Sequence, residues 1–219
     1  MTPPAVTPGA GDHLIDISIP VHEGTPEWPG DTPFSCRWTW DMRRGDSVNV
    51  SCMSLSPHVG THADAPFHVD PEASASESIA LDAFVGPATV VDVRGREGPL
   101  ARADLGVGVI RGGRLLLRTG HGIAAGTFPD GWPWLSPDCV VALGREGLRL
   151  VGVDAPSVDS RHSTTLEVHR AIFGAGAGVL ENLDLREVLP GDYELLAAPL
   201  RVTGLDAAPV RAVLRPLLP

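Results

Sequence analysis

Alternating apolar and polar residues mark the first quarter of the chain. In an extended chain, neighbouring side chains point to opposite faces, so this alternation predicts half-buried strands. Residues 13–21, 34–40 and 47–55 follow the pattern. The segment 26–33, PEWPGDTP, combines Pro, Gly and Asp and predicts a turn between the first two strands.

Short apolar runs later in the chain predict strands that are buried on both faces, and two segments predict helices. Residues 136–147 open with Ser-Pro, which suits an N-cap and a first helical position, and they end at a glycine. In residues 164–173, Thr164 and Glu167 have the spacing of a capping box. The predicted buried strands are 88–93, 114–120 and 148–154, and further strands are predicted at 178–183, 193–205 and 209–216.

These elements predict one mixed α/β domain, rich in strand, over residues 13–219. No internal repeat or linker divides it, and 219 residues are enough to bury a core without disulfides. Residues 1–12 are rich in Pro, Gly and Ala and predict a flexible N-terminal tail. The tail lacks the basic and apolar regions of a signal peptide.

Charge and composition narrow the class of protein. The net charge of −10 argues against nucleic-acid and anionic-membrane partners, and no apolar run reaches the ~20 residues of a membrane span. The chain contains no lysine, which excludes a Schiff-base lysine and a Walker A loop. The cysteines Cys36, Cys52 and Cys139 form no Cys-x-x-Cys pair and predict a reducing, cytoplasmic location.

The stretch HVGTHADAPFH, residues 58–68, holds three of the chain's eight histidines. Read as a strand, it points His58, His62 and Asp64 to one face, and its glycine leaves space between the two imidazoles. Two imidazoles and a carboxylate suit zinc or another borderline divalent cation, and three protein ligands leave positions open for catalysis. The proline would end the strand and bring His68 to the same site.

Two further residues are ambiguous from the pattern alone. His169 lies on the apolar face of a predicted helix, where a hydrogen-bonded core histidine is the more common case. Glu181 lies in the apolar run GVLENL, where a carboxylate is costly unless it is paired or coordinated. An exposed position at the start of a helix is the alternative. The chain has no Gly-x-Ser-x-Gly elbow, and GAGAG at 174–178 does not match a dinucleotide-binding loop.

The pattern His-x-Gly-Thr-His-x-Asp-x-Pro-x-His resembles the signature of the cyclase family of metal-dependent hydrolases, and residues 58–68 match every fixed position. The resemblance implies a swivelling β/β/α fold and a homodimer or larger homo-oligomer. It is strongest to members that hydrolyse N-formyl-L-kynurenine to L-kynurenine and formate in tryptophan breakdown. It continues through PEWPGDTPF, LLLRTG, LVGVDAPSVD, VLENL and GDYELLAAPLRVTGLDAAPVRAVL, nearly the whole chain beyond the tail.

The resemblance also implies two divalent metal ions per subunit, usually Zn²⁺, with Mn²⁺ as the alternative. Asp64 would bridge the two ions, and Glu181 would reach both. The five implied ligands are His58, His62, Asp64, His169 and Glu181.

Two residues have roles other than metal binding in this scheme. A water activated by the two ions would attack the formyl carbon, and His68 would supply the proton that the aromatic amine needs as it leaves. Trp28 would contact the aromatic formamide substrate by stacking on its ring, although a tryptophan that covers the core beside a turn fits the sequence nearly as well.

Other interpretations stay open from the sequence. A hydrolase of the same family could act on isatin or another cyclic amide, or tailor a secondary metabolite. A non-catalytic binding module could use the metal only to stabilise its fold. A serine hydrolase could cleave the same formamide. The open metal positions argue against the module, and the missing nucleophile elbow argues against the serine enzyme.

Overall fold

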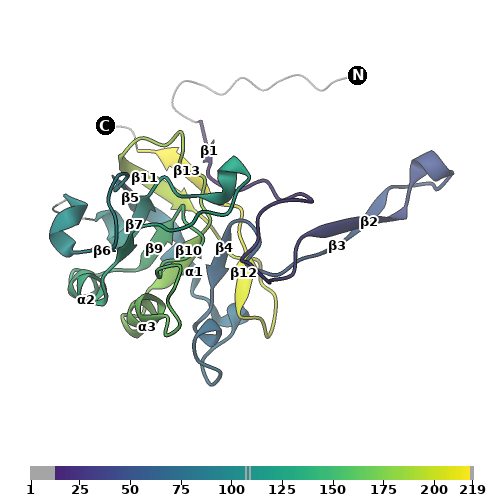
Figure 1. The fold of residues 1–219 in the computed structure, drawn as a ribbon. Coiled ribbons are helices and arrows are strands. Elements are labelled where there is room, and N and C mark those ends of the chain that lie inside the picture. The colour runs from purple at the N-terminus through teal and green to yellow at the C-terminus, as the bar shows by residue number, and fades with distance from the viewer. Residues whose placement is uncertain (1–12, 107, 109, 218–219) are drawn as a thin grey trace.

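The structure is a computed structural model that describes residues 13–106, 108 and 110–217, so the predicted tail lies outside the described residues. A nine-stranded sheet forms its centre (Figure 1). No helix in these ranges is long and apolar enough to cross a membrane. The strands in spatial order are β1 (Ile15–Asp16), β13 (Val213–Pro216), β11 (Gly191–Leu196), β5 (Val85–Asp92), β7 (Arg114–Arg118), β9 (Leu150–Val153), β10 (Gly178–Glu181), β4 (His62–Asp64) and β12 (Ala207–Pro209).

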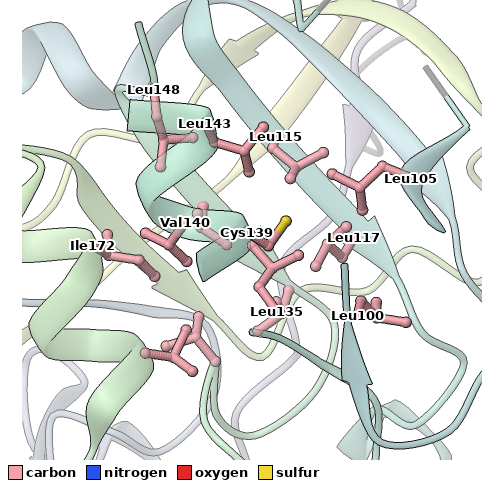
Figure 2. Packing of buried hydrophobic residues seen from close by; sticks show 14 of the residues in the cluster. Leu100, Leu105, Leu115, Leu117, Leu135, Cys139, Val140, Leu143, Leu148 and Ile172 are labelled. Atoms are coloured by element: carbon pink, nitrogen blue, oxygen red, sulfur yellow. The ribbon is translucent and has the colours of Figure 1, made fainter. Parts of the chain in front are cut away.

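The middle of the sheet is parallel and is buried on both faces. Strands β5, β7, β9 and β10 run in one direction, and strands on both sides of them pair antiparallel. Leu115 and Leu117 of β7 pack with residues of α2 (Pro137–Arg145) and α3 (Glu167–Gly174), as Figure 2 shows for α2. Leu116 belongs to the cluster on the other face. Two covered faces explain why these strands appear in the sequence as unbroken apolar runs.

The second hydrophobic cluster joins the two ends of the sheet. It contains Ala63 of β4 from one end, Leu214 of β13 from the other, and Leu150 and Leu180 from the middle. All four side chains are fully buried. The strand that carries the metal-ligand motif is therefore anchored by its middle residue to the core of the molecule.

The first predicted helix is confirmed, and so is its cap. Ser136 precedes α2, and its side-chain oxygen accepts a hydrogen bond from the backbone N–H of Cys139 at 3.2 Å. Proline occupies the first turn, where a missing N–H costs nothing. The remaining α-helix of the described ranges is α1 (Leu81–Phe84), and the short strands β6 (Pro99–Leu100) and β8 (Trp134–Leu135) pair with each other.

The second predicted helix exists, but its predicted capping box is wrong. Helix α3 begins at Glu167 itself, after Leu166 in the left-handed conformation (φ 50°, ψ 50°). The cap comes instead from Asp159, whose carboxylate accepts hydrogen bonds from two first-turn backbone N–H groups at 2.9 and 3.0 Å. A carboxylate from an earlier loop has replaced the local Ser/Thr cap that the spacing suggested.

Most predicted strands are present with shorter or shifted bounds, and one prediction about the motif is wrong. β4 begins only at His62, so His58 does not lie on a strand. Gly60 adopts φ +76°, and a Cβ there would lie 2.5 Å from Val21 Cγ2. This glycine makes a left-handed turn that packs against the N-terminal segment, rather than a space between two imidazoles. The segment 13–21 likewise contributes only β1 and a single bridge at Ser18.

One pair of strands leaves the body of the molecule. Strands β2 (Ser35–Trp40) and β3 (Val50–Ser54) form a separate antiparallel sheet that extends outward (Figure 1). Their alternation predicted one buried face, but every residue of both strands is exposed. We name this hairpin, residues 35–54, the arm.

Candidate metal centre

Strand pairing assembles the centre from distant parts of the chain. β4 pairs antiparallel with β10, and the register places Glu181 directly opposite His62. Asp64 leaves the same face of β4, because it is two residues further along the strand. Helix α3 then presents His169 to this edge of the sheet, where its imidazole is 1% exposed.

One group of ligand atoms gathers around Asp64 Oδ1. His58 Nδ1 and His62 Nε2 lie 3.1 Å apart, and their distances to Asp64 Oδ1 are 3.3 and 3.2 Å. Glu181 Oε2 lies 3.4 Å from His62 Nε2. Two imidazole nitrogens and two carboxylate oxygens thus converge on one small region.

A second group gathers around His169. Its Nε2 lies 2.9 Å from Asp64 Oδ2 and 3.3 Å from Glu181 Oε1. Each of the two carboxylates therefore directs one oxygen to the first group and its other oxygen to the second. We call these the His58 side and the His169 side of the centre.

Hydrogen bonds behind the imidazoles fix how the rings point. His169 Nδ1 lies 2.6 Å from Asp159 Oδ2, and His62 Nδ1 lies 2.9 Å from the carbonyl oxygen of Gly60. In both rings the Nε2 atom is the one that faces the centre. A carboxylate or carbonyl behind a histidine is the usual arrangement around metal-ligating imidazoles, because it sets the tautomer and the ring orientation.

Asp206 serves the His58 side in a similar way. Its Oδ2 lies 2.9 Å from His58 Nε2 and 3.5 Å from His68 Nδ1. Asp206 directly precedes β12, which pairs with β4, and its carbonyl oxygen accepts the backbone N–H of Ala65 at 2.9 Å. The hydrogen bond from His58 lowers the pKa of Asp206 to about 2 despite partial burial.

The charges of the buried ligands are mutually dependent. Burial alone would lower the pKa of His58, but hydrogen bonds to Asp206 and Asp64 raise it to about 10. Burial also opposes the charged form of His62, yet the charge of Asp64 raises its pKa to about 9. Without a metal, this pocket of carboxylates therefore retains protons on its imidazoles at neutral pH.

The donor set fits a cation. Asp64 Oδ1 is buried and has no hydrogen-bond partner among the described residues, although two imidazole nitrogens lie near it. Buried acceptors without donors are rare in native proteins and call for an ion or a proton. Two sets of ligand atoms each lie within 4.8 Å of one another: His58, Asp64 and His68, and His62, Asp64 and Glu181. Imidazole with carboxylate is chemistry that suits zinc or a similar divalent ion.

A cavity of about 720 Å³ opens onto the centre. His58, His68 and His169 lie along it, and Trp28 and Phe128 form part of its apolar wall. The Trp28 ring packs edge-to-face against Phe128, with centroids 5.4 Å apart, and remains 40% exposed. The lining of the cavity thus combines polar ligand residues with an aromatic wall.

The structure brings together all seven residues that the sequence predicted. His169 and Glu181, ambiguous from the pattern, are 1% and 3% exposed and face Asp64. Three contributors were missed: Asp159, Asp206 and Phe128. Both aspartates lie in stretches that carry the resemblance, LVGVDAPSVD and GLDAAPV. That resemblance was the available signal, and Asp206 also directly precedes the strand β12.

Comparison with known proteins gives a consistent result. The family model described as "Putative cyclase" matches residues 15–160. A curated protein from Bacillus mycoides (strain KBAB4), named kynurenine formamidase, is 43% identical over 204 residues, which cover 93% of this chain and 97% of that protein.

Two solved structures share the architecture. A predicted metal-dependent hydrolase from Bacillus stearothermophilus has a TM-score of 0.77 at 27% identity, and the match covers 94% of this chain and 98% of that one. Isatin hydrolase A from Ralstonia solanacearum has a TM-score of 0.74 at 23% identity, with 92% and 91% covered. At that identity, the second likeness establishes the fold alone.

Proposed function

The chain belongs to the Cyclase family, and we propose that it is a metal-dependent hydrolase that cleaves N-formyl-L-kynurenine to L-kynurenine and formate. Relatives named kynurenine formamidase, which match over more than nine-tenths of the chain, support this substrate. The observation that carries the proposal is the His/Asp/Glu centre beside a cavity with an aromatic wall.

We propose that the centre holds two divalent ions, with zinc favoured by its ligands and manganese as the alternative. His58 and His62 would hold one ion, His169 the other, and Asp64 and Glu181 would each give one oxygen to each ion. The split orientation of the two carboxylates supports this count. Bound divalent ions lower the pKa of a coordinated water and polarise a substrate carbonyl.

His68 is the proposed acid and base. Its Nδ1 faces Asp206 Oδ2 at 3.5 Å, which leaves Nε2 available to the substrate. The side chain is 28% exposed and lines the cavity, so it can meet both the attacking water and the leaving amine. His68 Nε2 would accept the proton of the water and give it to the aryl nitrogen as the C–N bond breaks.

The aromatic wall would hold the aryl ring of the substrate. Trp28 and Phe128 stand edge-to-face, and both line the cavity. Aromatic rings attract each other in offset or edge-to-face arrangements, beyond the gain from burial alone. Positioning the ring in this way would place the formamide at the ligand end of the cavity.

We further propose that the protein is a homodimer or larger homo-oligomer and that it works in the cytoplasm. Cys36, Cys52 and Cys139 are all unpaired, which fits a reducing compartment. The acidic balance of the chain supports a small-molecule substrate rather than a nucleic acid.

The test is hydrolysis of N-formyl-L-kynurenine by the purified protein, before chelation, after chelation, and after zinc or manganese is restored. We expect activity that is lost and then returns. Isatin, measured in parallel, is the control substrate for the cyclic-amide alternative. A protein that carries bound metal, hydrolyses isatin and leaves the formamide intact would contradict the proposed substrate but keep the metal centre.

A further inference from the structure

The turn WPGD, residues 28–31, carries a carboxylate that the reaction described so far does not use. The backbone N–H of Asp31 donates to the carbonyl oxygen of Trp28 at 2.9 Å, which closes the turn. Proline restricts φ at the second position, and Gly30 supplies a positive φ of +95° at the third, as a type II turn requires. The Cα atoms at the two ends of such a turn are less than about 7 Å apart. Trp28 and Asp31 are therefore held as neighbours.

Both ends of this turn line the cavity. The Trp28 ring is held there by edge-to-face contacts with Phe128 and Trp132, at centroid distances of 5.4 and 6.1 Å. Asp31 Oδ1 accepts a hydrogen bond from the backbone N–H of Thr32 at 2.6 Å, and the carboxylate forms no ion pair with any described residue. One carboxylate oxygen next to an aromatic wall is thus left for a group outside the described part of the chain.

The cavity lining is acidic, and no arginine contributes to it among the described residues. The chain contains no lysine either, and the carboxylates of the lining are those of Asp31, Glu181 and Asp206. Two of them already face ligand histidines, since Glu181 contacts His169 and Asp206 contacts His58. Asp31 is therefore the carboxylate of this lining that remains for a substrate.

Arg161 contacts the aromatic wall but does not line the cavity. Its guanidinium lies over the Phe128 ring, 5.1 Å from the ring centroid, and donates to the carbonyl oxygen of Pro129. The side-chain donors of the lining away from the metal centre are neutral, such as the hydroxyls of Ser163 and Thr164. A positively charged substrate group thus has a charged partner in this cavity, whereas a negatively charged group meets neutral donors outside the centre.

We propose that Asp31 binds the α-ammonium group of the substrate and thereby sets the specificity of the cavity. This inference rests on the proposed function, because N-formyl-L-kynurenine carries an amino acid side chain on the ring next to the formamide. An α-amino group is protonated at neutral pH and pairs with a carboxylate. One turn, closed by its own hydrogen bond, would hold the ring at Trp28 and the ammonium group at Asp31, so little order is lost on binding. The preferred class is an aryl formamide with a cationic side chain.

The proposal ranks the two charged groups of the substrate. Loss of the amine should weaken binding more than loss of the carboxyl group, because only the amine has a partner of opposite charge in the lining. Isatin has neither group and gains nothing from Asp31. The carboxylate of Asp31 is half-buried, so its effect on KM should be about five- to tenfold, between that of an exposed ion pair and that of a buried charged hydrogen bond.

The first experiment compares Asp31→Asn with the unchanged protein, both loaded with metal. Asparagine keeps Oδ1 as the acceptor for the N–H of Thr32 and removes the charge. KM for N-formyl-L-kynurenine should rise about five- to tenfold at a similar kcat, and Asp31→Glu should recover part of the loss. Asp138→Asn, which removes the same charge from the exposed surface of α2, is the matched control and should change neither value. An unchanged KM in Asp31→Asn would overturn the proposal.

Truncated substrates distinguish recognition of the amine from a change in the shape of the turn. One analogue of N-formyl-L-kynurenine lacks the carboxyl group, another lacks the amine, and ortho-formamidoacetophenone lacks both. In Asp31→Asn, KM should rise for the analogue that keeps the amine as much as for the full substrate, and it should stay within about twofold for the other two. An equal rise for all of them would make Asp31 a part of the cavity's shape. A rise confined to compounds with the carboxyl group would assign the contact to that group, and either result would overturn the proposal.

Binding of the product separates this inference from the proposed function. L-Kynurenine keeps the ring and the ammonium group, so calorimetry gives its Kd without any turnover. Asp31→Asn should raise this Kd by about the same factor as KM. If the protein leaves the formamide intact but binds L-kynurenine through Asp31, the inference stands and the proposed reaction fails. If it cleaves the formamide while both proteins bind L-kynurenine equally, the reaction stands and the inference fails. Absence of L-kynurenine binding to the unchanged protein would also overturn the inference.

Discussion

The two sides of the metal centre differ in how they are supported. On the His169 side, the imidazole is 1% exposed and the carboxylate behind it, Asp159, is 3% exposed. On the His58 side, the imidazole is 19% exposed and Asp206 behind it is 40% exposed. Asp159 also caps the helix that carries His169, whereas His58 lies in a turn next to the cavity.

This difference indicates that the two sides of the centre have different roles. Buried hydrogen bonds to a helix terminus hold the His169 side in one geometry, which favours tight binding of a cation. The His58 side is more exposed and shares Asp206 with His68, so we expect proton exchange with the substrate to take place there. In this view the His169 side holds the cation rigidly, and protons are exchanged at the His58 side. Asp64 and Glu181 join the two sides.

The largest effect should come from Asp64, which is common to both sides. Asp64→Asn removes a negative charge from the middle of the centre, and we expect bound metal and hydrolysis to fall to background together. Elemental analysis and the formamidase assay measure the two. His121→Ala, at an exposed histidine, is the control and should change neither. An Asp64→Asn protein with full metal content would contradict the shared role.

His68→Ala should separate binding from turnover. We expect metal content to stay normal and kcat to fall by about 10²–10⁴, the usual contribution of a positioned acid or base. Loss of metal in this variant would instead make His68 a ligand, which its place in the His58–Asp64–His68 group permits geometrically.

Asp159→Asn and Asp206→Asn compare the two sides directly. Loss of a carboxylate behind a ligating histidine typically lowers metal affinity by about 10–100-fold. We expect that loss for Asp159→Asn, because its buried contacts have no substitute in solvent. Asp206→Asn should keep most of the affinity and instead lower kcat, because Asp206 Oδ2 faces His68 Nδ1 and helps to orient that ring. Competition with a chelator and measurements of kcat give the answer, and equal losses of affinity would remove the asymmetry.

Metal affinity should depend on pH in a defined direction. The raised pKa values of His58, about 10, and His62, about 9, mean that the metal-free centre holds protons at neutral pH. A metal needs the neutral imidazoles, so affinity should weaken as pH falls below about 9, by about tenfold per pH unit for each proton displaced. Calorimetry in buffers of different ionisation enthalpy counts those protons. Affinity that is constant between pH 6 and 9 would contradict the pKa values.

The smallest effect should be at the aromatic wall. Trp28→Ala removes one of two rings, and the loss of an aromatic pair, about 0.5–1.5 kcal/mol, corresponds to a KM raised by about two- to tenfold. Trp28→Phe should recover most of it. A normal KM for Trp28→Ala would assign this tryptophan to packing against Phe128 and Trp132 only.

The sequence predicted the ligands that lie in one motif, but it did not predict the two aspartates that hydrogen-bond to the ligating histidines. His58, His62, Asp64 and His68 fall within eleven residues, so one motif contains them. Asp159 and Asp206 act on histidines through tertiary packing, and no local spacing records that contact. His169 and Glu181 needed the family resemblance for the same reason.

The prediction of the fold had the same limit, because contacts between distant parts of the chain leave no local pattern. The mixed α/β class, the helix at 136–147 and most strands follow from periodicity, because propensity and burial agree there. The cap of α3 was mistaken because a local Thr/Glu spacing competed with a carboxylate from another loop. The arm was correctly read as two strands, but alternation reveals only that one face is apolar, and not which surface covers it.

The wide sequence spacing of the ligands sets when the centre can exist. His169 and Asp64 are 105 residues apart, and His58 and Asp206 are 148 residues apart. Closing loops of such length costs more entropy than closing short ones, so we expect these contacts to form late in folding. A nascent chain has the His-x-Gly-Thr-His motif long before it has His169 or Asp206. We therefore expect a metal to be captured by a nearly finished fold, rather than to guide the early steps of folding.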